Sequence, residues 1–300
     1  MKRLLKYVEI TTKITSVFPF FLTLAYLFYT KTAINPLKTA VFFASMFIFD
    51  LTATTINNYM DTKKNHQTLQ FSRRTALAIT IALFVISMSL GLYLVYLTDA
   101  VVLILGVICF LFGVIYSWGP VPISHQPYGE IFSGLFYGLF IPFILLYINS
   151  PEGTYFSWAW DSAKMSLSLE FNAVPIISAL LLSVLPACLT ANIMLANNTC
   201  DLEKDILVKR YTLPYYLGRK ALLLFAGLYY MAYASVVLTV IFRMLSPLCL
   251  AIFLTIIPVQ KNINRFFNKQ VKEETFIASV QNFVIIISAQ ILLVFASAFI

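Results

Sequence analysis

Charged residues are scarce in this sequence. They make up 11% of its 300 residues, whereas soluble globular domains contain about 25%. Acidic residues are the rarer sign, with 13 against 21 basic ones, so the net charge is +8. A chain that is 60% hydrophobic has too few polar side chains to be an ordinary soluble domain. The composition therefore predicts an integral membrane protein.

Cysteine is also rare. The four cysteines are Cys109, Cys188, Cys200 and Cys249. Three of them fall inside apolar runs, and their spacing matches neither a metal-binding motif nor a disulfide framework. We therefore expect free, packed thiols.

Long apolar runs, in contrast, recur along the whole sequence. A helix needs about 20 apolar residues to cross a bilayer. The runs that approach or reach this length are 14–30, 38–60, 76–97, 100–118, 128–149, 173–197, 219–243, 245–259 and 277–300. No long soluble domain fits between them. We predict an all-α, polytopic membrane protein of about nine transmembrane helices, folded as a single domain over residues 1–300.

The N-terminal run follows several basic residues, as a signal peptide would. It is long for a signal peptide, and no small-residue cleavage site follows it before Lys31. We therefore expect a retained first helix.

Basic residues are distributed unevenly between the predicted loops. With the N-terminus in the cytoplasm, only Lys31, Lys38, Lys164 and Arg243 of the 21 basic residues fall on the outer side. Positive loops remain cytoplasmic, so we predict a plasma-membrane protein with its N-terminus inside and its C-terminus outside. Nucleic-acid binding is the alternative explanation. Because the charges flank membrane spans, attraction to anionic lipid explains them better.

A short polar pattern occurs twice at the ends of apolar runs. The segment 57–61, Asn-Asn-Tyr-Met-Asp, closes the second run, and the segment 197–201, Asn-Asn-Thr-Cys-Asp, closes the sixth, with Asp205 one turn further on. Residues at i and i+4 share a helix face. A single copy could be a helix cap, but two matched copies of oxygen ligands favour Mg²⁺, which is typically shared with substrate phosphates. The pattern indicates a diphosphate substrate within a membrane.

The motif-bearing helices are four apart, so both run in the same direction. The chain is therefore predicted to contain two pseudo-repeated four-helix units plus one helix around a central cavity. The motif loops, 57–75 and 197–220, would both be cytoplasmic. Carriers built from inverted repeats differ, because their halves have opposite orientations.

Basic and acidic residues near the motifs are further candidates. Lys63, Lys209 and Arg210 follow the motifs and could contact phosphate oxygens, although cytoplasmic loops are basic in any case. Asp50 precedes Asp61 by three turns on roughly the same face and lies about 16 Å deeper by helix rise. A carboxylate at that depth either binds the second substrate or hydrogen-bonds a neighbouring helix.

The two motifs resemble those of the UbiA superfamily of intramembrane prenyltransferases, whose pattern is N-D-x-x-D followed by D-x-x-x-D on the sixth helix. Segments 116–123 and 127–132, and segment 209–213 after Asp201-x3-Asp205, are similar to those of 1,4-dihydroxy-2-naphthoate polyprenyltransferases. The resemblance covers the chain from about residue 10 onward.

The resemblance implies a set of roles. Asn57 and Asp61 would hold one Mg²⁺, and Asn197, Asp201 and Asp205 a second. The three aspartates would be catalytic. Substrate would contact the residues Asp50, Asn57, Asn58, Lys63, Tyr116, Asn197, Asn198, Lys209 and Arg210. Asn58 departs from the family, which usually has Asp there, so the first site is less anionic here.

The implied reaction transfers a polyprenyl group from polyprenyl diphosphate to an aromatic acceptor. With dihydroxynaphthoate, a step of menaquinone biosynthesis, the ring loses CO₂ as diphosphate is released. Other acceptors, such as 4-hydroxybenzoate or haem, remain open. Alternatives from other classes are a secondary carrier for an anionic solute and a non-catalytic lipid-binding protein.

Overall fold

The computed structural model describes residues 2–64, 68–161 and 164–300. Within them, nine helices are long and apolar enough to cross a membrane. They span Ile10–Tyr29, Pro36–Thr62, Arg73–Leu97, Ala100–Ser117, Gly129–Asn149, Ala173–Cys200, Lys220–Ile241, Pro247–Asn268 and Ile277–Phe299. The prediction of a helical fold with nine spans is confirmed.

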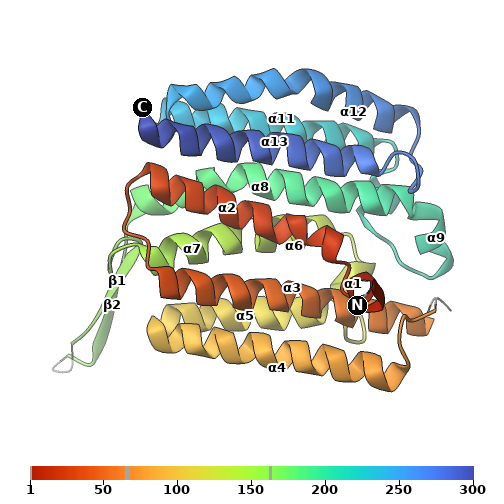
Figure 1. Cartoon of the computed structure of the whole chain (residues 1–300), viewed down its shortest axis with the longest axis horizontal. Coiled ribbons are helices and arrows are strands. Elements are labelled where there is room, and N and C mark those ends of the chain that lie inside the picture. The colour runs from red at the N-terminus through yellow and green to blue at the C-terminus, as the bar shows by residue number, and fades with distance from the viewer. Residues whose placement is uncertain (1, 65–67, 162–163) are drawn as a thin grey trace.

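The helices form layers that lie roughly parallel to one another (Figure 1). The first half of the chain contains α1 (Lys2–Tyr7), η1 (Ile10–Lys13), α2 (Ile14–Tyr29), α3 (Pro36–Lys64), α4 (Arg73–Leu97), α5 (Ala100–Ser117) and η2 (Ile123–His125). The fifth span is composite and consists of α6 (Gly129–Leu135), the π-helical turn η3 (Phe136–Phe140) and α7 (Ile141–Asn149).

The second half contains the remaining spans and two short helices between the sixth and seventh spans. Its elements are α8 (Ala173–Cys200), α9 (Leu202–Leu207), α10 (Leu213–Leu217), α11 (Lys220–Ile241), η4 (Pro247–Thr255), α12 (Ile256–Asn268), α13 (Ile277–Ala296) and η5 (Ser297–Phe299). Helices α11, α12 and α13 lie on one side of the bundle, and α3, α4 and α5 lie on the other (Figure 1).

Two apolar cores hold these layers together. Phe225 of α11, Ile252 of η4 and Phe283 of α13 belong to one core, and Leu145 of α7 belongs to the other. Helices α2 and α8 contribute residues to both cores. They therefore join the two halves of the bundle.

Glycine allows α8 to pack closely on the fifth span. A Cβ added at Gly138 would lie 2.2 Å from the Ala187 Cα, and one at Gly134 would lie 3.0 Å from the Ala187 carbonyl oxygen. No side chain fits at Gly138 unless the helices separate. Small residues at this spacing are typical of close helix contacts in membranes.

Two segments differ from the prediction. The segment 150–172, which falls between the predicted fifth and sixth spans, contains an antiparallel hairpin of β1 (Phe156–Asp161) and β2 (Ser166–Phe171). The eighth span continues to Asn268 instead of ending near residue 259, because α12 is amphipathic. It buries Val259, Ile263 and Phe266, so polar residues on its other face do not interrupt the helix.

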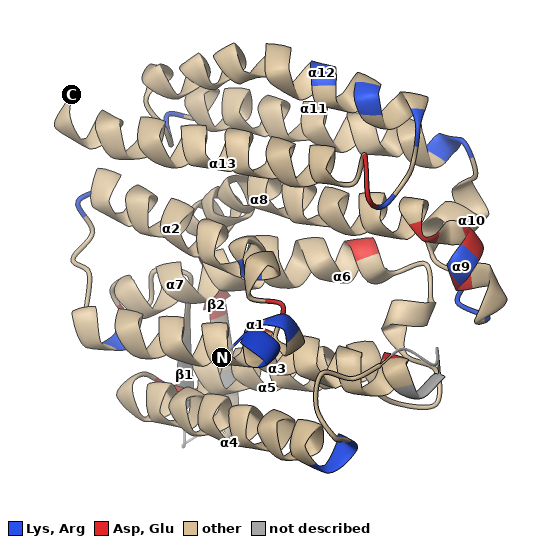
Figure 2. Ribbon diagram, turned by 45° about the vertical axis from the view of Figure 1, so that its right-hand side comes forward, with Lys and Arg blue, Asp and Glu red and all other residues tan. Residues whose placement is uncertain are grey.

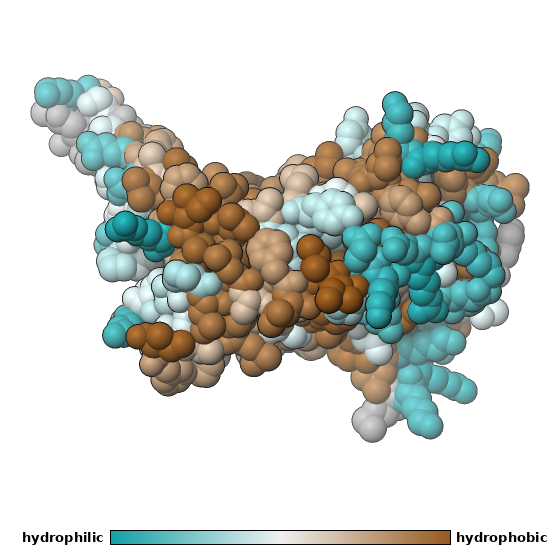
Figure 3. Space-filling view, turned by 90° about the horizontal axis from the view of Figure 1, so that it is seen from above, coloured by the Kyte–Doolittle hydropathy of each residue, from teal (hydrophilic) through white to brown (hydrophobic). Residues whose placement is uncertain are grey.

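Polar residues gather at the end of the bundle that carries α9 (Figure 3). Lys and Arg occur there on α1, α9 and α12 and at the start of α4 (Figure 2). The N-terminus lies at this end, whereas the hairpin and the C-terminus lie at the other (Figure 1). An odd number of spans puts the termini at opposite ends.

Candidate functional site

The two polar motifs converge where α3 and α8 end. Asp205 of α9 is 6% exposed, and burial raises the pKa of its carboxyl to about 6. The positive charges of Arg210 and Lys272 oppose this pKa shift, while the negative charges of Asp201 and Asp61 add to it. Asp61 of the first motif therefore lies near enough to the second motif to interact with Asp205.

Asp205 Oδ2 of the second motif and Arg210 Nε beside it are buried and have no hydrogen-bond partner among the described residues. Arg210 Nε lies 3.7 Å from Asp205 Oδ2, which is too far for a hydrogen bond. The Arg210 backbone N–H donates to the Asp205 carbonyl at 2.9 Å, which holds the two side chains near each other. Such atoms are available to a bound ligand.

A basic residue that the sequence analysis did not assign to the site contacts this motif. Lys272, between α12 and α13, donates from Nζ to Asn197 Oδ1 and to Asp201 Oδ2 at 2.5 Å. The sequence gives no local signal for this contact, since Lys272 lies 71 residues beyond Asp201.

In the first motif the two asparagines face different neighbours. Asn57 Oδ1 accepts a hydrogen bond from Ser117 at 3.0 Å. Asn58 Nδ2 donates to the Tyr7 carbonyl at 2.9 Å and to Glu9 Oε1 at 3.1 Å. Consecutive helical residues do not share a face, so Asn58 is engaged by the N-terminal segment and not by the second motif.

The side chain of Asn198 likewise has a different partner from that of its neighbour Asn197. Its Nδ2 donates to Glu130 Oε1 at 2.8 Å, and both side chains are buried. Glu130 was not predicted as a site residue, although an acidic residue at the start of an apolar run is a usable signal. Tyr116 Oη lies 3.6 Å from Met194 Sδ beside this pair.

The predicted phosphate-binding residues have different surroundings. Arg210 is partly buried beside Asp205, and Lys209 is exposed, with a left-handed φ of 58°. The side chain of Lys63 lies outside the described part of the chain. Of the described side chains among them, Arg210 is the one that lies at the motifs.

A cavity of about 630 Å³ extends from the first motif into the bundle. Its lining comes from residues between Glu9 and Ile144 and from Met194 of α8. The lining is mostly apolar and aromatic, with Asp50, Asn57 and Tyr137 among its polar members. Its lining also includes side chains of α4 and α5 that are accessible to solvent, namely Met88, Leu92, Leu103, Val107 and Leu111. Helices α4 and α5 therefore form part of the cavity wall.

Asp50 lies in this cavity wall within a dense polar cluster. Its Oδ1 accepts from Lys13 Nζ at 3.0 Å and from Tyr137 Oη at 2.8 Å, and its Oδ2 accepts from Ser16 Oγ at 2.6 Å. Lys13 is itself only 3% exposed. A buried carboxylate needs a buried counter-charge, and sequence spacing does not reveal this pairing.

The oxygen donors suit a magnesium ion that is shared with a ligand. No three His, Cys, Asp or Glu side chains among the described residues are close enough together to hold an ion alone. Mg²⁺ is usually bound by one or two carboxylates together with water and phosphate oxygens. Asp61 and Asp205, with the unsatisfied Asp205 Oδ2, fit that arrangement.

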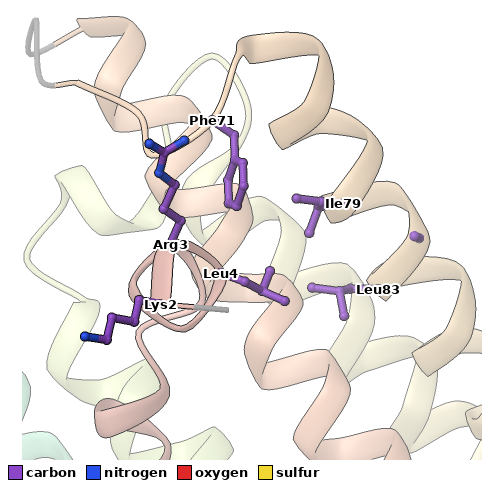
Figure 4. A pocket seen from close by; sticks show the side chains of 7 residues that line it. Lys2, Arg3, Leu4, Phe71, Ile79 and Leu83 are labelled. Atoms are coloured by element: carbon purple, nitrogen blue, oxygen red, sulfur yellow. The ribbon is translucent and has the colours of Figure 1, made fainter.

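A separate hollow of about 700 Å³ lies between α1 and α4. Figure 4 shows Leu4, Phe71, Ile79 and Leu83 around it. Lys2 and Arg3 are its basic lining residues, and no acidic residue is among its described lining residues. This hollow does not suit a divalent cation.

The chain matches a protein-family model and is similar in sequence to a known enzyme. The family model described as the UbiA prenyltransferase family matches residues 16–285. The 1,4-dihydroxy-2-naphthoate octaprenyltransferase of Bacillus subtilis (strain 168) is 27% identical over 247 residues, which are 78% of this chain and 72% of the relative.

Solved structures share the fold. A UbiA homologue from Archaeoglobus fulgidus bound to GPP and Mg²⁺ has a TM-score of 0.67 at 16% identity, covering 99% of this chain and 100% of that chain. The apo UbiA homologue from Aeropyrum pernix K1 has a TM-score of 0.65 at 16% identity, covering 92% of this chain and 96% of that chain. At these identities the likeness concerns the fold alone.

Proposed function

This chain belongs to the UbiA prenyltransferase family, and from that premise we propose that it transfers a polyprenyl group from polyprenyl diphosphate to 1,4-dihydroxy-2-naphthoate. The name of the Bacillus subtilis relative supports this acceptor. Binding of GPP and Mg²⁺ by the Archaeoglobus fulgidus homologue supports a prenyl diphosphate donor and a divalent metal. A carbon–carbon bond forms to the ring as the allylic carbon–oxygen bond breaks, and the ring carboxylate leaves as CO₂.

The observation that carries this proposal is the convergence of Asp61 with Asp201 and Asp205 beside an apolar cavity. A diphosphate held at the motifs would extend its prenyl chain into that cavity. An opening between α4 and α5, whose lining side chains are accessible to solvent, would let a chain longer than the cavity continue into the bilayer. A carrier for a small anionic solute would have no use for such an opening.

The proposed roles of the polar residues follow from their positions. Asp61, Asp201 and Asp205 would hold Mg²⁺ together with Asn57 and Asn197. When bound, Mg²⁺ neutralises charge on the leaving diphosphate. Arg210 is positioned to donate from its unsatisfied Nε to a diphosphate oxygen. Asn58 and Asn198 support the site through their bonds to the N-terminal segment and to Glu130.

The cavity wall protects the reacting carbon and binds the acceptor. Aromatic side chains, including Phe49, Phe110 and Tyr116, line it, and their ring faces stabilise a developing allylic cation. The apolar wall excludes water, which would otherwise capture the cation. Tyr137, held by Asp50, offers its oxygen as an acceptor for a ring hydroxyl of the second substrate.

The proposal is tested by product formation. Purified protein with Mg²⁺, octaprenyl diphosphate and dihydroxynaphthoate is expected to release diphosphate and CO₂ in equal amounts and to yield a prenylated naphthoquinol. Asp61→Ala and Asp201→Ala are expected to lower turnover by about 10²–10³-fold, because each removes charge stabilisation of the leaving group. Product is measured by chromatography and mass spectrometry.

Glu170→Ala is the matched control, because Glu170 is an exposed acidic residue on the hairpin at the other end of the bundle. It should retain full activity. Full turnover in the Asp61 and Asp201 variants would contradict the roles of these residues. Faster product formation with 4-hydroxybenzoate than with dihydroxynaphthoate would contradict the acceptor.

A further inference from the structure

The hollow of about 700 Å³ between α1 and α4 combines basic side chains with an apolar wall. Leu4, Ile79 and Leu83 point into the space between the two helices (Figure 4). Arg3 lies at its rim beside Phe71 (Figure 4). Such a hollow suits a ligand that is anionic at one end and apolar at the other.

Helix α1 is fixed beside α4 by its last residue. Tyr7 is buried, and its Oη lies 3.1 Å from Thr80 Oγ1 and 3.3 Å from the Ala76 carbonyl oxygen of α4. The Tyr7 ring also meets the Phe71 ring edge-on, with 5.8 Å between their centres. The hollow is therefore bounded by a helix that packing holds in place.

The basic residues of α1 have no counter-charge within the described part of the chain. Lys2, Arg3 and Lys6 are exposed, and none of them belongs to an ion pair among the described residues. Arg73, at the start of α4, is instead held by the Tyr59 ring, with its guanidinium carbon 5.3 Å from the ring centre. Lys2 and Arg3 are therefore available to an anion outside the protein.

The apolar wall lies deeper in the membrane than these charges. Helix α4 is a membrane span that begins at Arg73, and the helix rise places Ile79 and Leu83 about 9 and 15 Å further along it. The headgroup layer on each side of a bilayer is about 5–8 Å thick. With Arg73 at headgroup level, Ile79 and Leu83 reach the hydrocarbon region.

The exposed leucines of α1 also indicate contact with lipid. Leu4 and Leu5 are 41% and 42% exposed, and they stand between the basic residues of the same short helix. Helices with this mixture of side chains lie in the membrane interface, with the apolar residues in lipid and the basic ones among the headgroups. Basic residues occur at this end of the bundle on other elements as well (Figure 2).

We propose that the hollow between α1 and α4 binds one anionic phospholipid. Lys2 and Arg3 contact the headgroup phosphate, and an acyl chain lies against Leu4, Ile79 and Leu83. The guanidinium group offers forked donors to phosphate oxygens, and basic pockets beside membrane helices suit anionic headgroups. A soluble phosphate compound would leave the apolar wall unfilled. A zwitterionic lipid would gain less from the two cations.

Lipid binding to the full-length protein tests this inference. Protein in neutral detergent is titrated with dioleoyl phosphatidylglycerol, and native mass spectrometry measures the fraction with one bound lipid. Dioleoyl phosphatidylcholine has the same chains but no net charge, and it is expected to bind about tenfold more weakly. Glycerol 3-phosphate has the phosphate but no chains, and a large excess of it is expected not to displace the lipid.

Two double variants assign the headgroup contact. Lys2→Gln combined with Arg3→Gln is expected to lower the affinity for phosphatidylglycerol by about 10–30-fold, because both cations near the headgroup are lost. Arg219→Gln combined with Lys220→Gln is the matched control, since it removes the same charge from exposed residues at the start of α11. The control should keep the wild-type affinity.

Ala82→Phe tests the apolar part of the site without changing any charge. Ala82 lines the hollow at an exposed position of α4, so a larger side chain there fills the space of the acyl chain without entering the protein core. The affinity is expected to fall about tenfold, which corresponds to about two fewer buried methylene groups. Ala78→Phe is the control, because Ala78 is exposed on α4 outside the lining of the hollow. The melting temperature of each variant checks its fold.

Equal binding of the two phospholipids would overturn the inference. Unchanged affinity in the Lys2 and Arg3 double variant or in Ala82→Phe would do the same. An equal loss in the Arg219 and Lys220 control would show general attraction of anionic lipid without a site. Displacement by glycerol 3-phosphate would show a phosphate site that needs no lipid chain, which also contradicts the proposal.

Discussion

Lys13 and Asp50 form an ion pair inside the helical bundle, with both side chains almost fully buried. Ser16 and Tyr137 complete the hydrogen bonds of the Asp50 carboxylate. Removing charges from water is costly, and the pairing together with the hydrogen bonds of both side chains offsets that cost. The two residues therefore depend on each other for stability.

A double-mutant cycle measures this dependence. Asp50→Leu alone is expected to lower the free energy of unfolding by about 3–5 kcal/mol, because it leaves the Lys13 ammonium buried without a counter-charge. Adding Lys13→Met is expected to restore much of the loss, since the buried charge is then gone. Unfolding is followed by circular dichroism in detergent. Equal destabilisation by the single and double variants would show that the pair is not coupled.

Helix α8 carries the second motif, and its position depends on its contact with the fifth span. Gly138 faces Ala187 so closely that a methyl group would overlap the backbone, with its Cβ 2.2 Å from the Ala187 Cα. Either α8 or η3 must then move. A movement of α8 would also displace Asn197 and Asp201 at its end.

Gly138→Ala is expected to reduce the free energy of unfolding by about 1–3 kcal/mol or more through overpacking. Gly227→Ala is the control, because nothing lies within 4 Å of the added Cβ. That change should be neutral or add about 0.5–1 kcal/mol, the usual effect of Ala for Gly in a helix. Thermal unfolding of both proteins checks the comparison. A stable Gly138→Ala protein would mean that the helices separate at little cost.

At the scale of the whole molecule, the distribution of basic residues and the positions of the two termini indicate the same membrane orientation. The end of the bundle with α9 carries the clustered Lys and Arg residues (Figure 2), and the C-terminus lies at the opposite end (Figure 1). Because positive loops stay in the cytoplasm, we propose that the motif end faces the cytoplasm.

We further propose that residues 1–300 act as one domain, since α2 and α8 contribute residues to both cores.

Protease protection tests the orientation. In sealed right-side-out vesicles, a C-terminal epitope tag should be removed by added protease, whereas an N-terminal tag should survive until detergent opens the vesicles. Inside-out vesicles should give the reverse pattern, which serves as the internal control. Loss of the N-terminal tag from right-side-out vesicles would place the motifs on the outer side.

The sequence alone determined the helical class, the nine spans and the two motifs. Apolar runs of bilayer length have few alternatives to a helix, and residues at i and i+4 share a face in any helix. The hairpin was not predicted, because a short segment outside the bilayer is not constrained in this way. The extension of α12 was missed for a related reason, since its polar face hides the helix from an apolar-run count.

Only the tertiary structure decided which polar side chains meet. Lys272 reaches Asp201 across 71 residues of sequence, and Glu130 reaches Asn198 across 68. Asn58 and Asn198 match the motif pattern yet bond elsewhere, because neighbouring positions on a helix point in different directions. Local periodicity fixes the face of a helix on which a residue lies. The partner opposite that face depends on how distant helices pack, and packing is a property of the whole chain.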